Sequence, residues 1–300
     1  MRKKNIRSCL SALLSCLLLL LPACRPVEKQ ITVVIRESGS GTREAFDRTV
    51  TNGKHFLEEL SPLGKKINRN APDAVVQTKN GTLLSAVAYD PYAIGYLSLA
   101  SVNDLVRVVS VDGVYPSQAS LEDRSYPLYR PFVIMTSTTQ ELSPITADFL
   151  AYLKSDAAAI HADAAGASFL ASPTARANPS AAPIPVEEYR AKDTIPAGKV
   201  QIRGSTSLER LITSAVRSYA EIYGVDAASH FDIRLEGSSI GRKSVLNDRS
   251  GSVIGLSSAE VEEDGIESFR IALDAIAVIL HRDNTAVQSH TVHNTSHSEL

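Results

Sequence analysis

Residues 33–46 read VVIRESGSGTREAF, and this stretch decides the fold. The β-branched residues Val33, Val34 and Ile35 are typical of a buried strand. Residues 38–42 contain only Ser, Gly and Thr, and the residues after them are typical of the start of a helix. The pattern therefore predicts a strand, a tight turn and a helix, with Arg36 before the turn.

The same arrangement occurs twice more, after Ile202 and after Leu235. Glycine lets a backbone approach a ligand closely, and the first turn of a helix presents N–H groups without partners and a partial positive charge. One such turn is explained by helix capping alone. Three of them, the first flanked by Arg36 and Arg43, indicate a site for a small anion.

The first turn does not fit a nucleotide loop. A phosphate loop of the ATPase kind needs Lys directly after its last glycine, whereas Thr42 and Arg43 follow Gly41 here. A dinucleotide fingerprint would need a further spaced glycine where Ala45 and Phe46 stand. The formal net charge is −2 and no dense Lys/Arg block is present, which argues against a nucleic-acid partner.

The N-terminus predicts export and lipidation. Four basic residues within the first seven precede an apolar run over 9–21, which is too short to span a bilayer comfortably. Leu-Pro-Ala-Cys over 21–24 resembles the lipobox of bacterial lipoproteins, so we expect cleavage before Cys24 and attachment of a lipid to its sulfur. An ordinary secretory signal is the alternative. Either way the product is expected outside the cytoplasm, and as a lipoprotein it would be held on the cell membrane.

Cys24 would be the only cysteine left after cleavage, which excludes a disulfide within the chain and a metal site built on cysteine. His290, His293 and His297 have no carboxylate or cysteine at ligand spacing, so no metal or other cofactor is expected.

One change in composition divides the chain. Residues 171–198 are rich in Ala, Pro and Ser and predict an extended linker. The resulting expectation is a signal peptide over 1–23, a tether over 24–30, a lobe over 31–170, the linker over 171–198, a lobe over 199–284 and a polar tail over 285–300.

Both segments alternate strand-like and helix-like patterns. Apolar residues recur three and four apart from Leu208 to Tyr223, which predicts a helix ended by Gly224. Another helix is predicted over 145–166, and a buried strand over 271–280. This alternation predicts an α/β fold with mixed sheets flanked by helices.

These residues resemble the PstS-like substrate-binding lipoproteins of phosphate ABC transporters. The likeness is carried by VVIRESGSGTREAF, PYAIGYLSL, VQIRGSTSLERLITSAVRSYAE and LEGSSIGRKSVLND. It implies a two-lobed, type II periplasmic-binding-protein-like fold, inorganic phosphate or a related oxyanion as ligand, and a membrane permease as partner. It also implies a binding protein, not an enzyme. Carried over by position, it assigns the ligand to Arg36, Ser40, Gly41, Thr42, Thr206, Ser207 and Ser238.

Two features depart from the family. The part that resembles the family's second half precedes the part that resembles its first half, as in a circular permutant. Ser258 stands where some members have a carboxylate that accepts the proton of hydrogen phosphate, so the sequence does not secure phosphate over sulfate. Asp274 is a candidate substitute, but a structural aspartate at a strand end is the preferred interpretation.

Two other functions compete with transport. Gly237 to Gly241 fits the G-x-S-x-G pattern of a serine hydrolase, with Ser239 as nucleophile and with Asp274 and His281 following in the usual order. No segment of the kind that forms an oxyanion hole precedes it. The remaining alternative is a surface lipoprotein that kept the fold without transport.

Overall fold

The computed structural model describes residues 31–53, 57–60, 66–169, 188–284 and 291–292. The expected signal peptide with Cys24, the tether, most of the linker and nearly all of the polar tail lie outside these residues. Within the described part, no helix has both the length and the hydropathy that a membrane crossing requires.

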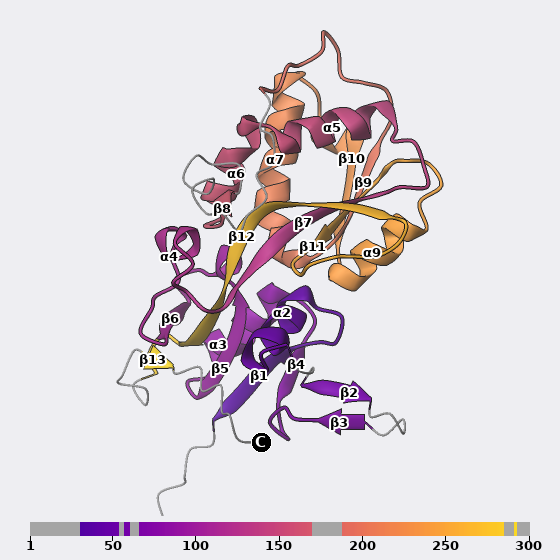
Figure 1. Cartoon of the computed structure of the whole chain (residues 1–300). Coiled ribbons are helices and arrows are strands. Elements are labelled where there is room, and N and C mark those ends of the chain that lie inside the picture. The colour runs from indigo at the N-terminus through magenta and orange to yellow at the C-terminus, as the bar shows by residue number, and fades with distance from the viewer. Residues whose placement is uncertain (1–30, 54–56, 61–65, 170–187, 285–290, 293–300) are drawn as a thin grey trace, which may run out of the picture. The chain divides into compact units, whose positions relative to one another are not determined.

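Two long strands join the two halves of the fold, β7 (Tyr129–Ser137) and β12 (Ile266–His281). They pair antiparallel with each other, and beyond Ala275 β12 continues between β5 and β6. Figure 1 shows both strands running between a lower part that holds α2 and α3 and an upper part that holds α7 and α9. We call the lower part the first lobe and the upper part the second lobe.

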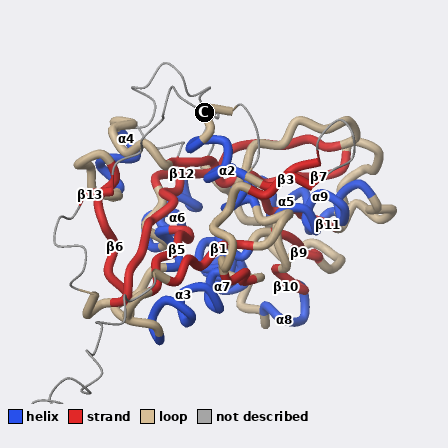
Figure 2. Tube along the Cα trace, turned by 90° about the horizontal axis from the view of Figure 1, so that it is seen from below, coloured by secondary structure: helices blue, strands red, loops and turns tan. Residues whose placement is uncertain are grey.

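The first lobe contains the strand order β6-β12-β5-β1-β4, which Figure 2 shows in part from below. Its elements are β1 (Thr32–Arg36), α2 (Gly41–Val50), β2 (Glu58–Leu60), β3 (Lys66–Asn68), β4 (Val75–Gln77), α3 (Asn80–Tyr89), β5 (Ala93–Ser98), η1 (Leu99–Ser101), β6 (Val106–Val111) and α4 (Gln118–Glu122). The strand β13 (Thr291–Val292) pairs with β6. β1 is parallel to its neighbours β4 and β5, so both its faces are covered, as its apolar sequence predicts.

The second lobe contains the order β10-β9-β11-β7-β12, with β8 also paired to β12. Its further elements are α5 (Pro144–Lys154), η2 (Asp156–Ala158), α6 (Ala159–Ala164), β8 (Ser168–Phe169), β9 (Val200–Gly204), η4 (Thr206–Leu208), α7 (Glu209–Ile222), α8 (Ala227–His230), β10 (Phe231–Leu235), α9 (Ser238–Leu246) and β11 (Val253–Ser257). The mixed sheets and flanking helices confirm the predicted fold class.

Each lobe is built from both sides of the linker, rather than one lobe from each segment. The core of the second lobe packs Phe132 and Phe149 against Ile202 and Tyr219. In the first lobe, Ile279 of β12 packs with residues that precede the linker. The physical reason is that β7 and β12 are buried strands, and β12 pairs with different partners in the two lobes.

The single helix predicted over 145–166 is wrong in one respect, because it is broken. α5 ends at Lys154, and Ser155 is extended with φ −89° and ψ 170°. The Ser155 hydroxyl donates to the Tyr152 carbonyl at 2.7 Å, so the side chain satisfies a backbone group that a continuing helix would use. The predicted helix over 208–223 and the strand over 271–280 are confirmed as α7 and part of β12.

Candidate anion-binding site

The first Ser/Gly turn forms the start of α2, as predicted. Gly39 has φ +90°, a left-handed conformation that favours glycine. Ser40 is the N-cap, and its hydroxyl accepts a hydrogen bond from the Arg43 N–H at 3.4 Å. The Arg43 guanidinium donates to the Arg36 carbonyl at 3.0 Å. Arg43 therefore holds the turn, and the N–H groups of Gly41 and Thr42 lie in the first turn of α2, where a helix offers them no partner of its own.

Ser207 connects this turn to the second lobe. Its hydroxyl lies 3.2 Å from that of Thr42, so the first and second predicted turns meet directly. The same oxygen accepts from Asn80 Nδ2 at 3.0 Å and from Arg130 Nη2 at 3.0 Å. Ser207 and Thr42 are both buried.

The third turn, at the start of α9, also contacts the turn at the start of α2. The Ser239 N–H donates to the Gly39 carbonyl at 3.3 Å, which joins two turns that are far apart in the sequence. The Ser238 hydroxyl accepts from the Ser258 N–H at 3.1 Å. A Cβ on Gly41 would collide with the hydroxyls of Ser238 and Ser258, so this position needs glycine for close approach.

We call Thr42, Ser207, Ser238 and Ser258 the serine cluster. Arg36 is buried beside it. Its guanidinium donates to the Glu37 carboxylate at 3.0 and 3.1 Å and to Asn80 Oδ1 at 2.5 Å. Because Asn80 also donates to Ser207, Arg36 is linked to the serine cluster through one amide side chain.

A buried ion pair lies behind Ser207. Arg130 Nη2 is 2.8 Å from Asp274 Oδ2, and both side chains are at most 1% exposed. Burial raises the pKa of the Asp274 carboxyl, and the neighbouring Arg130 guanidinium opposes that shift. Asp274 also accepts from the Ser98 hydroxyl at 2.8 Å. It lies within β12, so its predicted place at a strand end is wrong, and its partners Arg130 and Ser98 are groups of the protein itself.

The structure thus brings together Arg36, Ser40, Gly41, Thr42, Ser207 and Ser238 from both lobes. Thr206 is adjacent but differs, because its buried Oγ1 has no hydrogen-bond partner among the described residues. Ser258 brings no charge to the cluster; its hydroxyl accepts from that of Ser205 at 2.9 Å.

Sequence analysis missed Asn80 and Arg130. Arg130 carries a recognisable signal, since a cation inside the apolar strand YRPFVIM must have a buried partner. Asn80 follows the short strand β4 at the start of α3 and has no comparable signal, because Lys79-Asn80-Gly81 reads as an ordinary turn.

The hydrolase interpretation is not supported by the geometry. Asp274 and His281 are seven residues apart on β12, which corresponds to about 23 Å at about 3.3 Å per residue and to opposite faces. Asp274 is paired with Arg130, and His281 Nδ1 accepts from the Asp283 N–H. Within the described residues, no group of three or more His, Cys, Asp or Glu side chains is placed to hold a metal ion.

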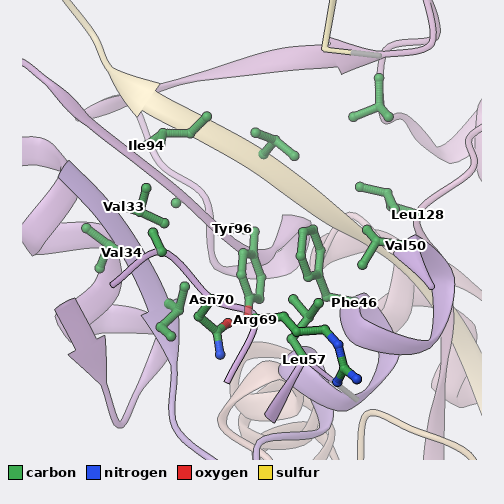
Figure 3. A pocket seen from close by; sticks show the side chains of 15 residues that line it. Val33, Val34, Phe46, Val50, Leu57, Arg69, Asn70, Ile94, Tyr96 and Leu128 are labelled. Carbon is green, nitrogen blue, oxygen red and sulfur yellow. The ribbon is translucent and has the colours of Figure 1, made fainter. Parts of the chain in front are cut away.

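An apolar cavity of about 460 Å³ lies elsewhere in the first lobe. Figure 3 shows Tyr96 and Phe46 side by side in it, with ring centroids 4.1 Å apart. Burial raises the pKa of the Tyr96 hydroxyl. None of the residues lining this cavity belongs to the serine and arginine cluster.

Two α/β lobes joined by crossing strands, with polar turns meeting between them, define a solute-binding protein of the periplasmic-binding-protein type. A family profile described as "PBP superfamily domain" matches residues 25–157. Phosphate-binding protein PstS 2 of Streptococcus pneumoniae is 33% identical over 261 residues, which cover 86% of this chain and 80% of that protein. PstS 2 of Streptococcus agalactiae is 30% identical over 258 residues, covering 85% and 79%.

A solved structure agrees with these relatives. The phosphate-binding protein of a phosphate ABC transporter from Streptococcus pneumoniae matches with a TM-score of 0.60 and 30% identity, over 89% of this chain and 93% of that one. The chain belongs to the PstS family of the PBP superfamily.

Proposed function

We propose that the protein captures inorganic phosphate, or a similar tetrahedral oxyanion, outside the cytoplasm and delivers it to the permease of an ABC importer. The observation that carries the proposal is the meeting of Thr42 and Ser207, one from each lobe, at the starts of helical segments. The names of its PstS relatives support phosphate as the ligand.

The anion would be held by hydrogen bonds more than by net charge. Arg36 is already paired with Glu37, and Arg130 with Asp274, so each guanidinium is electrically balanced. Additional binding comes from backbone N–H groups at the starts of α2 and α9 and from the hydroxyls of the serine cluster. The Thr206 hydroxyl, which has no partner among the described residues, supports a partner from outside the chain, because buried polar groups are normally hydrogen-bonded.

These groups are sufficient in number for useful affinity. A charge-assisted hydrogen bond contributes about 1.5–3 kcal/mol, and micromolar affinity needs about 8 kcal/mol. Three to five such bonds would therefore reach the micromolar range.

Selectivity would be set by hydroxyls. A serine hydroxyl both donates and accepts hydrogen bonds, so Ser258 can accept a hydrogen bond from the P–OH of hydrogen phosphate and can equally donate one to sulfate. Asp274 is not available for this purpose, since Arg130 and Ser98 occupy its Oδ2. We therefore expect phosphate and sulfate to differ by less than a carboxylate-lined site would allow.

Two further points concern the lipid on Cys24 and the order of the two halves along the chain. A lipid on Cys24 would keep the protein on the membrane, where its permease lies. The Arg36 turn precedes the Gly204 turn here, and PstS 2 of Streptococcus pneumoniae matches over 86% of this chain and 80% of its own length, so the expected reversed order of halves does not hold relative to that protein. The lipid is tested by incorporation of labelled palmitate, which Cys24→Ser should abolish and a Cys16→Ser control should not.

Calorimetric titration of the full chain in detergent with phosphate, sulfate and molybdate tests the ligand. We expect Arg36→Ala to weaken phosphate binding about tenfold or more, because it removes the buried guanidinium that positions Asn80 beside Ser207. Arg48→Ala is the matched control, since Arg48 lies at the far end of α2 with a 61% exposed side chain. Absence of binding by the folded wild-type chain would favour a surface lipoprotein that kept the fold without transport.

A further inference from the structure

A second pocket, of about 580 Å³, lies beside the candidate site at the start of α3 and along α7. Asn80 forms part of its lining, and the same side chain hydrogen-bonds Arg36 and Ser207 inside the site. Asn80 is therefore shared between this solvent-facing pocket and the residues proposed to hold the anion.

Two arginines of α7 line this pocket. Arg210 and Arg217 are exposed and make no hydrogen bond or ion pair with any residue in the described part of the chain. Seven residues apart on a helix, they lie on nearly the same face and about 10 Å apart along the axis. Thr213 and Ser214 lie between them, and the Ser214 hydroxyl is hydrogen-bonded to His161 Nδ1 at 2.9 Å.

A neighbouring pocket offers a contrast in charge. It shares Gly81, Glu209 and Thr213 with the pocket that contains Asn80, and it is lined by Thr206 instead of Asn80. Its cations Lys79 and Arg234 are balanced by Glu209 and Glu236. In the pocket that reaches Asn80, Glu209 is the one carboxylate against two arginines among the described lining residues, so that pocket carries net positive charge.

We propose that the pocket between Arg210 and Arg217 is the entrance through which the anion reaches the site, and that these two arginines accelerate its capture. The inference rests on the proposed function. The arginines act before binding, by raising the concentration of anions at the mouth of the pocket, since a cleft lined by one sign of charge increases association rates. Their exposure leaves the guanidinium groups able to meet an anion from solvent.

The test is the association rate of phosphate with the full chain, measured by stopped-flow fluorescence of a dye attached away from both pockets. At about 20 mM salt we expect Arg210→Gln combined with Arg217→Gln to lower the association rate constant about tenfold, with the dissociation rate changed less than twofold. At about 0.5 M salt the difference should disappear, because screening shortens the range of these charges. The lysine pair Arg210→Lys with Arg217→Lys should keep the wild-type rate.

Two further variants show whether the position of the charge matters. Arg190→Gln with Arg282→Gln removes the same charge from exposed positions outside the pocket lining and should leave the rate unchanged. Thr213→Glu, at an exposed position inside the pocket, should lower the rate at low salt without removing either arginine.

The outcomes separate this inference from the proposed function. If the wild-type chain binds none of phosphate, sulfate and molybdate, the proposed function fails. If it binds phosphate but the glutamine pair associates at the wild-type rate, or the control pair slows association equally, the entrance is wrong and the proposed function stands.

Discussion

Gly41→Ala tests whether close contact between the turns is what makes the site. Gly41 begins α2 and lies against Ser238 and Ser258 of the second lobe. An alanine Cβ at this position would lie 2.6 Å from the Ser258 hydroxyl oxygen and 3.1 Å from the Ser258 carbonyl carbon. Ordinary contacts begin at 3.4 Å, so the hydroxyl must move away by about 0.8 Å.

That displacement is large on the scale of a hydrogen bond. A bond of about 2.9 Å lengthened by about 0.8 Å is no longer within hydrogen-bond distance. If two bonds to the anion are lost at about 1.5–3 kcal/mol each, the affinity falls by at least about 100-fold. The folded state loses less, about 1–3 kcal/mol, because overpacking is relieved in part by rotation of the serine side chains.

The assay is phosphate titration by calorimetry together with urea unfolding, and Gly53→Ala is the matched control. Gly53 follows the other end of α2 with φ +72° and has open space around it. Alanine there should cost about 1–2 kcal/mol of stability through its left-handed backbone and leave the affinity unchanged. Wild-type affinity in folded Gly41→Ala, or equal losses of affinity in both variants, would refute the reasoning.

Three further predictions concern stability. Asp274→Ala should lower the free energy of unfolding, measured in urea, by about 3–5 kcal/mol because it leaves Arg130 buried without its carboxylate. The control Asp232→Ala, in the partly exposed pair with Arg203, should lower it by about 1 kcal/mol or less. Equal losses in the two variants would contradict this prediction. Burial raises the pKa of Asp148, but hydrogen bonds from three tyrosine hydroxyls outweigh it and the net pKa is lowered. The stability that Asp148 contributes is thus present above about pH 3.9 and is lost as the pH falls through the lowered pKa. Asp148→Asn should therefore reduce the loss of unfolding free energy at acid pH. An unchanged loss would contradict the lowered pKa of Asp148. Burial lowers the pKa of His161, so the unfolded chain takes up the proton first, and stability should fall as the pH drops below about 6.5. His161→Gln should reduce that fall in thermal unfolding between about pH 7 and about pH 5, and an equally steep fall would count against a neutral buried imidazole.

Much of the candidate site could be predicted from local sequence. A strand, a run of small residues and a helix start specify where backbone N–H groups are left without partners, and this physics acts within a few residues. The turns at Gly39, Ser207 and Ser238 are predictable for that reason, and the structure places all three together. The periodicity of α7 is equally local, and its buried face follows the predicted spacing.

Other features depend on partners that are far away in the sequence. Arg130 and Asp274 are 144 residues apart, and neither residue alone reveals that the other neutralises it. Asn80 is an ordinary turn residue until the fold places it between Arg36 and Ser207. The break at Ser155 has a different cause, a local competition for the Tyr152 carbonyl that periodicity does not register.

The sequence by itself determined the strand-turn-helix units and the backbone N–H groups and hydroxyls that their turns offer, because both follow from backbone hydrogen bonding over short stretches. Only the tertiary structure decided that the turns face one another and that both lobes draw on both sides of the linker. The physical reason is that β7 and β12 each pair in more than one place, and pairing between distant strands is set by the packing of the whole core rather than by any stretch of the chain.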